Sequence, residues 1–583
     1  MNATILLLRL LSLLLIILAL IDPAYPVKII ADGLFSADAA AFLSYSLAVA
    51  SLLVLAFSFF PAQAARLGGF LQSKIASTDE RKIAAAIFVL GFILKFTLSF
   101  AVPENFYYHD GAQYSSLAYS LYTGKGYVTD TLWAVMLGGN PPMQDIYRAP
   151  MEPFMIYVFY MLFGPSFFSE KLLSVFLGAL IPALVFVLST RIFAGKSVAL
   201  LSAALAFFSW IIFAYSRVIH TELAMMVFTL LFFIFLVNFR YRLADYLLLG
   251  IAFSASYLTR YQALYILPVV AAIYFYAGTR SVKKTVQVTA IILIVFAAIT
   301  LPWFFRMYSL TGDPFYSDLK YIASSEFHAD PDYYLYSLDT PKESFLDVAL
   351  SNPASMAAAF VARILTQIKN TPLYLLDPVT TLLFLTGIVY ALPSAKKEYW
   401  AILAYITASY AFLSVFFSVA RHLQPLIPFM LVFSAFGAKK LYETAGSLRT
   451  WIICILVLSL AVNLALIAFA YQGLDKRGES SKNTYSLFQD YIRPNGIENV
   501  TFMVDSFPYF YDYYSRGAMR VVQFPYYSNY TEFQAYIAYH NVSYIVLHQD
   551  SILKIPHTIP DIMKGNISLV YSGHERNVYR LNE

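Results

Sequence analysis

Long apolar runs, separated by short polar connections, make up most of this chain. A helix needs about 20 predominantly apolar residues to cross the hydrocarbon core of a bilayer. Runs near this length recur and predict a polytopic α-helical membrane protein with about thirteen transmembrane helices. We expect these helices at residues 5–21, 40–60, 83–102, 168–190, 198–214, 221–238, 245–258, 262–277, 285–305, 373–392, 399–419, 423–438 and 450–471. The first is interpreted as an uncleaved helix, because Arg9 stands late for the basic region of a signal peptide and no small-residue cleavage site follows.

Composition agrees with this pattern. Of 583 residues, 59% are hydrophobic and only 13% are charged, whereas about a quarter of the residues of a soluble protein are charged. The net charge of +5 is small and lies mostly in short connections, which argues against a nucleic-acid partner. The one cysteine, Cys454, can form no internal disulfide and no cysteine metal site.

The basic residues indicate the orientation of the helices. They gather in six connections, at Arg66/Lys74/Arg81/Lys82, Arg191/Lys196, Arg240/Arg242, Arg280/Lys283/Lys284, Lys396/Lys397 and Lys439/Lys440/Arg449. Following the predicted helices in order places all six groups on the same side of the membrane. That side is the cytoplasm by the positive-inside rule. We therefore expect a multi-pass protein of the cell (plasma) membrane.

Three longer segments then lie outside the cytoplasm, at residues 103–167, 306–372 and after about 472. The first contains Phe154–Phe163, which is too short to span and is expected to lie at the interface. The second ends in the amphipathic stretch Met356–Ile368. The predicted organisation is therefore two additional N-terminal helices (1–82), a membrane core (83–471) and a small extracytoplasmic domain (472–583).

The C-terminal domain is predicted to be α/β. Strands are expected at Val500–Val504, Met519–Phe524 and Tyr544–Leu547, a helix at Thr531–Tyr539, and a closing pair of strands at Leu569–Tyr571 and Val578–Arg580. Four Asn-x-Ser/Thr triplets fall here, at Asn499, Asn529, Asn541 and Asn566. Their grouping in one region is typical of a glycosylated exterior and suggests an archaeal cell envelope.

Cations gather on the outer side, against the orientation bias. Arg217, Arg260, Arg306 and Arg421 fall at or just beyond outer helix ends, Arg148 lies in the first external segment, and Lys95 is inside a helix. Each could be structural, extending to lipid headgroups or pairing with a carboxylate. Charge at this depth is nevertheless typical of function, and arginine suits phosphate because of its planar, bidentate donors. The set therefore predicts a site for the phosphate of a carrier lipid.

One acid accompanies these cations. Asp110 follows the helix expected at 83–102, on the same side of the membrane. An acid in a loop is often a solvated turn residue. Sugar transfer from a lipid phosphate, however, needs a carboxylate base for the acceptor hydroxyl, and cations for the leaving phosphate. Asp110 with the arginines would be sufficient for that reaction.

Several motifs carry a resemblance to a known family. They are His109-Asp110-Gly111-Ala112-Gln113-Tyr114 with the following Tyr119–Tyr127, Arg148-Ala149-Pro150-Met151-Glu152-Pro153-Phe154, Tyr215-Ser216-Arg217 with Glu222, Leu258-Thr259-Arg260, and Arg421–Pro428. In order and sidedness, residues 83 to about 470 resemble the C-type superfamily of membrane glycosyltransferases, on the branch of protein O-mannosyltransferases and the aminoarabinose transferase. The oligosaccharyltransferase branch is less similar, because the C-terminal segment has no Trp-Trp-Asp signature.

The resemblance implies an inverting glycosyltransferase, a hexosyl- or mannosyltransferase, that uses a polyprenyl- or dolichyl-phosphate sugar. Its acceptor would be a hydroxyl of a protein, glycolipid or glycan, and its base the matching Asp110. Arg217, Arg260 and Arg421 are then candidates for donor phosphate binding, with Arg148 and Lys95 as weaker members. Candidate substrate contacts are His109, Tyr114, Glu152, His220, Glu222 and His422.

Three alternatives stay open. A divalent metal could be held by His109, Asp110, His220 and Glu222, although the proposed reaction needs no cofactor. A transporter or flippase of a lipid-linked sugar would be expected to show charges near the bilayer midplane and repeated halves. We find no repeat, and the cations lie toward one face. A receptor whose C-terminal domain binds ligand would leave the outer arginines unexplained.

Overall fold

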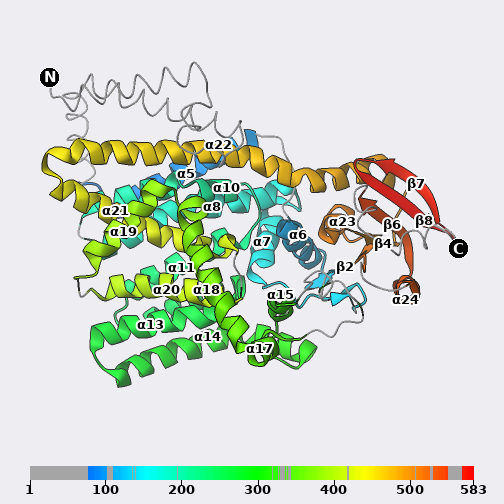
Figure 1. Ribbon diagram of the computed structural model, residues 1–583, viewed down its shortest axis with the longest axis horizontal. Helices are drawn as coiled ribbons and strands as arrows, with labels where there is room; N and C mark the ends of the chain where they lie inside the picture. The colour runs from blue at the N-terminus through cyan, green and yellow to red at the C-terminus, as the bar shows by residue number, and fades with distance from the viewer. Residues whose placement is uncertain are drawn as a thin grey trace, which may run out of the picture.

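The computed structural model consists of a helical bundle with a β-sheet at one end (Figure 1). It describes residues 77–101, 109–133, 136–137, 139–193, 195–317, 319–325, 327–328, 335, 338, 343–394, 396–416, 419–505, 507–525, 530–548 and 567–582. The helices predicted at 5–21 and 40–60 lie outside these residues, as do Asn529 and Asn566.

Twelve helices of the described chain form the bundle and its extension. They are α5 (Glu80–Ala101), α8 (Phe167–Ile192), α9 (Lys196–Phe207), α10 (Trp210–Tyr215), α11 (Thr221–Val237), α12 (Leu243–Thr259), α13 (Ala263–Thr279), α14 (Val282–Thr311), α19 (Pro378–Ala391), α20 (Lys397–Phe416), α21 (Ile427–Thr444) and α22 (Arg449–Leu487). Four helices in the described ranges could each cross a membrane by length and composition, or up to five if a bent pair counts as one. Shorter apolar helices of 10–17 residues accompany them. A membrane bundle is thus supported, while the number of thirteen spans stays a prediction.

Burial distinguishes central helices from peripheral ones. Most residues of α11 are buried. In the most apolar 18-residue stretch of α5 only 17% of the residues are buried, and in that of α14 only 28%. Apolar side chains that face outward are expected where a helix meets lipid. Helices α19 and α21 cross closely, because a β-carbon on Gly387 would come within 2.0 Å of the carbonyl oxygen of Phe433. Only glycine permits that approach.

Two predicted spans differ in detail from the observed helices. The helix expected at 198–214 is interrupted between α9 and α10, where the backbone N–H of Trp210 donates to Oδ1 of Asn463 at 3.2 Å. The side chain from α22 thus satisfies a donor that the helix leaves free. The helix expected at 373–392 begins later, because Asp377 caps α19 by accepting from the backbone N–H of Thr380 at 2.9 Å.

The α6–α7 segment (residues 109–163) connects the first described helix of the bundle to α8. It contains α6 (His109–Tyr122), β1 (Val128–Thr129), β2 (Thr131–Leu132), β3 (Met143–Gln144) and α7 (Met151–Phe163). Strands β1 and β3 pair in an antiparallel arrangement. A helix is present where one was expected at 154–163: it is α7, which begins directly after Pro150. Its position at the membrane interface stays a prediction.

A second connecting segment follows α14. It contains α15 (Leu319–Ser325), α17 (Phe345–Ser351), α18 (Pro353–Asn370) and a π-helical turn, η2 (Thr371–Leu375). The amphipathic stretch expected at 356–368 is the central part of α18, which is bent by 112° from α17. Short turns also occur at η3 (Ala420–Leu426), η4 (Gly446–Leu448) and η5 (Phe488–Ile492).

The C-terminal sheet region (residues 500–582) contains the predicted elements and one more helix. It comprises β4 (Thr501–Val504), α23 (Pro508–Ser515), β5 (Arg520–Gln523), α24 (Tyr530–His540), β6 (Val542–His548), β7 (Ile567–Gly573) and β8 (Arg576–Leu581). The strand order is β2-β5-β4-β6-β8-β7. Strands β2, β5, β4 and β6 are parallel to one another, and β8 pairs in an antiparallel arrangement with both β6 and β7. Its first strand, β2, comes from the α6–α7 segment.

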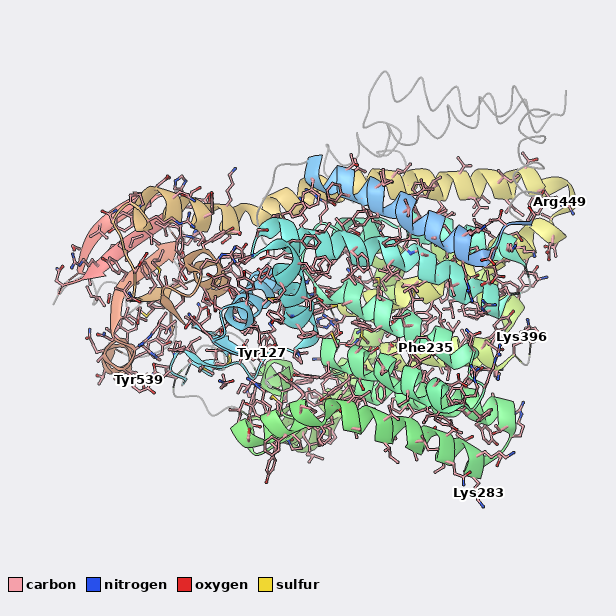
Figure 2. The ribbon with its side chains drawn as sticks, turned by 180° about the vertical axis from the view of Figure 1, so that it is seen from behind. Tyr127, Phe235, Lys283, Lys396, Arg449 and Tyr539 are labelled. Atoms are coloured by element: carbon pink, nitrogen blue, oxygen red, sulfur yellow. The ribbon has the colours of Figure 1, made fainter. Side chains whose placement is uncertain are left out.

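The bundle has two distinct ends. Figure 2 shows Lys283, Lys396 and Arg449 at the end away from the sheet region, in which Tyr539 is labelled. Helix α22 runs along the bundle and continues to the sheet (Figure 1). Three of the six basic connections of the predicted cytoplasmic side therefore lie at the end opposite the C-terminal sheet region.

Candidate active site

Asp110 lies in the first turn of α6 between two arginines. Its Oδ1 is 2.8 Å from Nη2 of Arg148, and its Oδ2 is 3.0 Å from Nη2 of Arg421. The carboxylate is 19% exposed. The predicted base and two of the predicted cations therefore meet, although they come from distant parts of the chain.

Arg148 is held in place by several groups. Its Nε donates to Oε1 of Gln113 at 2.6 Å, its Nη1 donates to the hydroxyl of Tyr114 at 3.2 Å, and its guanidinium lies 4.6 Å from the ring centroid of Tyr147. The turn before it is built by Asp145, which is fully buried and accepts from the backbone N–H of Arg148 at 2.8 Å. Sequence reasoning did not select Asp145, because an acid that organises its own turn has no distinguishing pattern.

Opposing effects set the protonation of Asp110. Burial alone would raise the pKa of its carboxyl, but the positive charges of Arg148 and Arg421 outweigh burial and hold the pKa below its usual value. Asp110 is therefore ionised at physiological pH. Its strength as a base would increase if one guanidinium turned to another anion.

Glu222 forms the second acidic centre, in the first turn of α11, and is 0% exposed. Its Oε1 is 2.9 Å from Nη2 of Arg260 and 3.5 Å from Nε of Arg421, and its Oε2 is 3.3 Å from Nδ1 of His220. Arg421 therefore contacts both acids. Because Arg260 follows α12 and Arg421 lies in η3, the ends of several bundle helices meet here.

Other predicted substrate contacts lie around this cluster. Burial, and then the charges of Arg260 and Arg421, lower the pKa of His422 to about 3, so this imidazole is neutral at physiological pH. Glu152 is 1% exposed in the first turn of α7, and its Oε2 accepts no hydrogen bond from the part of the chain that the structure describes. His109 is the first residue of α6.

Three further predicted cations occupy different surroundings. The Lys95 ammonium, within α5, lies 4.3 Å from the ring centroid of Phe213 and has no hydrogen-bond partner among the described side chains and backbone. Arg217 is 7% exposed, in the turn after α10. Arg306 donates to the backbone carbonyl of Tyr127 at 3.2 Å, which ties α14 to the α6–α7 segment.

The acids of the cluster contact guanidinium groups. Within the described ranges, no group of three or more His, Cys, Asp or Glu side chains is arranged to hold a metal ion. The chemistry that these residues can supply is anion binding by Arg148, Arg260 and Arg421, and proton acceptance by a carboxylate.

Comparisons with known proteins agree with this geometry. The family model described as "Dolichyl-phosphate-mannose-protein mannosyltransferase" matches residues 147–303, a range that includes Arg148, Glu222 and Arg260. No curated protein sequence matches the chain.

Two solved structures share its architecture. ArnT from Cupriavidus metallidurans, bound to undecaprenyl phosphate, aligns with a TM-score of 0.55 and 11% identity over 85% of this chain and 97% of that one. The archaeal oligosaccharyltransferase AglB from Archaeoglobus fulgidus, in complex with an inhibitory peptide and a dolichol-phosphate, aligns with a TM-score of 0.54 and 12% identity over 86% of this chain and 75% of that one.

The chain therefore has the fold of the C-type membrane glycosyltransferases. Together with the family match over residues 147–303, this fold confirms the resemblance inferred from the motifs.

Proposed function

We propose that this protein is an inverting glycosyltransferase that moves a sugar from a polyprenyl- or dolichyl-phosphate carrier to an acceptor hydroxyl. The observation that carries the proposal is the position of Arg421, which contacts both Asp110 and Glu222. Arg421 contacts the candidate base Asp110 and lies next to Arg260. If the Arg421 guanidinium turned to bind a phosphate, the pKa of Asp110 would change.

The reaction follows from these positions. The acceptor oxygen attacks the anomeric carbon of the sugar while the bond from that carbon to the phosphate oxygen breaks. The hydroxyl proton passes to Asp110, and the carrier phosphate leaves with the bonding electron pair. Attack opposite the leaving group inverts the anomeric centre. Arg260 and Arg421 stabilise the charge that develops on the phosphate, as preorganised cations do in other transferases.

Donor binding would also activate the base. When Arg421 turns its donors toward the phosphate, Asp110 loses one of the charges that depress its pKa. The carboxylate then accepts a proton more readily. Deprotonation of the acceptor is thereby coupled to the presence of the donor. Without a bound donor, Asp110 would accept a proton less readily.

The names of the similar proteins support the substrate class. The compared ArnT structure holds undecaprenyl phosphate and the compared AglB structure holds a dolichol-phosphate and a peptide. By analogy we propose a lipid-linked donor for this chain, mannose as the first sugar to test because of the family match, and a protein, glycolipid or glycan acceptor. Arg217, Lys95 and Arg148 are proposed as further donor contacts, and His109, Tyr114, Glu152, His220, Glu222 and His422 as substrate contacts.

We further propose that transfer occurs on the extracytoplasmic side of the cell membrane, in an archaeal envelope. The separation of the basic connections from the C-terminal sheet region supports this orientation (Figure 2). It agrees with the positive-inside rule if the sheet lies outside.

The test is sugar release from radiolabelled dolichyl-phosphate mannose and glucose by purified protein in detergent. Wild type is compared with Asp110→Asn and with Asp347→Asn, which changes an exposed acid of α17. We expect release by wild type and Asp347→Asn, and a rate about 100- to 10,000-fold lower in Asp110→Asn. Unchanged release by a folded Asp110→Asn protein would refute the assignment of the base. Movement of labelled carrier across proteoliposomes without transfer would favour the flippase alternative.

A further inference from the structure

The C-terminal sheet region is built partly from the segment that carries the candidate base. Strand β2 extends the parallel sheet at its edge, with Thr131 opposite Val521 of β5. The backbone N–H of Val521 donates to the carbonyl of Asp130 at 2.9 Å, and the hydroxyl of Thr131 donates to Oδ2 of Asp512 at 3.0 Å. The sheet is therefore attached to the α6–α7 segment by backbone and side-chain bonds.

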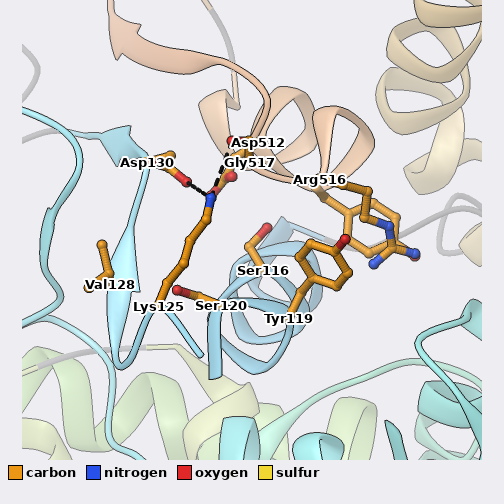
Figure 3. Close-up of a pocket in the computed structure, with 10 residues that line it drawn as sticks. Ser116, Tyr119, Ser120, Lys125, Val128, Asp130, Asp512, Arg516 and Gly517 are labelled. Carbon is orange, nitrogen blue, oxygen red and sulfur yellow. Dashed lines mark hydrogen bonds and ion pairs between the residues drawn. The ribbon is translucent and has the colours of Figure 1, made fainter. Parts of the chain in front are cut away.

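Helix α23 also packs against α6, through Arg516. The guanidinium of Arg516 lies 5.1 Å from the ring centroid of Tyr119 in α6 (Figure 3). It also lies 4.6 Å from the ring centroid of Tyr513 in α23. Helix α6 has 14 residues, with Asp110 in its first turn and Tyr119 in its last. A contact that moves Tyr119 therefore moves Asp110, because the helix transmits displacement along its length.

A buried acid of the bundle acts on the charge of Arg516. Glu170, in the first turn of α8, is 0% exposed and accepts a hydrogen bond from the hydroxyl of Tyr160 in α7. Burial opposes the charge of Arg516, but Tyr513, Tyr160 and Glu170 hold its pKa above the usual value. The charge of the Arg516 guanidinium is thus stabilised by groups of α7 and α8 as well as of α23.

Contacts of Lys125 and Trp133 complete this junction. Nζ of Lys125 lies 3.8 Å from Oδ2 of Asp130 and donates to the carbonyl of Gly517 at 3.4 Å (Figure 3). The ring of Trp133, directly after β2, lies 5.6 Å from that of Tyr509 in α23 and 5.3 Å from that of Tyr147. Tyr147 precedes Arg148, so the junction contacts the residue next to Arg148 as well as the helix that carries Asp110.

We propose that the C-terminal sheet region positions the candidate active site, and that Arg516 is the positioning residue that fixes α6, and with it Asp110, relative to Arg148 and Arg421. The proposal rests on the proposed function in its effect on catalysis, but its structural content can be measured independently of activity. Arg516 acts through Tyr119 and Glu170 and touches none of the reacting groups.

The catalytic test separates kcat from the donor KM. Arg516→Ala is expected to lower kcat roughly 100-fold, the effect of misplacing a catalytic group by about 1 Å. The donor KM should change less than threefold, because Arg260 and Arg421 belong to other elements. Arg516→Lys retains the charge beside Glu170 without the planar contact to Tyr119, so it should recover part of kcat. Arg493→Ala, at an exposed position after η5, is the matched control.

Hydrogen exchange in α6 supplies the measurement that needs no activity. Arg516→Ala and Tyr119→Leu should both accelerate amide exchange at residues 109–122 relative to wild type, while Arg493→Ala should not. Unchanged exchange in both variants would overturn the proposal, as would a normal kcat in Arg516→Ala. If wild type releases no sugar from any carrier, the proposed function fails, while accelerated exchange in α6 would still establish the junction.

Discussion

Replacing Glu222 by glutamine is expected to destabilise the protein far more than the same replacement at Glu152. Both side chains are buried, at 0% and 1% exposed. Glu222 contacts Arg260, Arg421 and His220, whereas no cation contacts Glu152 within the described part of the chain. The two substitutions therefore place the same neutral amide in two surroundings that differ in counter-ions.

The magnitude follows from the charges of the cluster. Three guanidinium groups (Arg148, Arg260, Arg421) face two carboxylates (Asp110, Glu222), so Glu222→Gln raises the net charge from +1 to +2. Removing one partner of a buried ion pair costs about 3–5 kcal/mol. The retained amide oxygen can still accept from Arg260, which favours the lower end of that range. At Glu152, a neutral amide should change stability by about 1 kcal/mol or less.

The assay is unfolding of both variants in mixed micelles, followed by tryptophan fluorescence as the fraction of denaturing detergent increases. A loss of 3 kcal/mol corresponds to roughly a 100-fold change in the unfolding equilibrium constant. The matched substitution at Glu152 controls for the loss of a buried acid as such. Equal loss of stability in the two variants would refute the reasoning, because it would mean that burial and not the arginine contacts determines the role of Glu222.

Three further outcomes are expected. In Arg421→Lys the single amine cannot reach Asp110 and Glu222 with separate nitrogens. Donor affinity, measured by binding of labelled carrier, should fall roughly ten- to 100-fold, the value of a charge-assisted hydrogen bond. Unchanged affinity would remove Arg421 from the donor site. Burial raises the pKa of Asp512 from 3.8 to about 7. As the pH rises, Asp512 therefore loses its proton in the unfolded chain before it does so in the folded protein. The free energy of unfolding should fall by on the order of 4 kcal/mol between about pH 4 and pH 7. Asp512→Asn should flatten that part of the stability profile, and an equal slope in both proteins would contradict it. Lys95→Met should keep the fold, since its ammonium has no described hydrogen-bond partner, and should raise the donor KM if Lys95 binds phosphate; an unchanged KM would exclude that role.

The sequence predicted the helices well where one physical property decides the structure. Apolar length predicted most of the bundle, and the apolar runs of α8 and α11 end within a few residues of the expected limits. It was less informative where polar residues continue a helix. The span expected to end at 471 continues as α22 to Leu487, because leaving the apolar region does not by itself end a helix.

The candidate site was predicted in its residues but not in its contacts. Asp110 and Arg421 were selected by sidedness and motif order, yet only the fold shows that they bond to each other. Arg148 was expected as a weaker member and is the nearest cation to the base, at 2.8 Å. Helix α23 was not expected, because its buried aromatic side chains lack an amphipathic pattern. A two-residue strand such as β2 carries no signal of its own.

The sharing of β2 constrains how the protein can be made. Thr131 and Asp512 bond to each other although they are 381 residues apart in the chain. Membrane proteins are synthesised from the N-terminus, so α6 and β2 exist before β5 and α23 that complete the sheet. Such non-local pairing closes late and slowly. Nascent chains that end before α23 and β5 should therefore form the bundle while α6 is not yet fixed in position. In this way the synthesis of α23 and β5 determines when α6 is fixed in position, and a chain cut before them would remain an incompletely assembled membrane bundle.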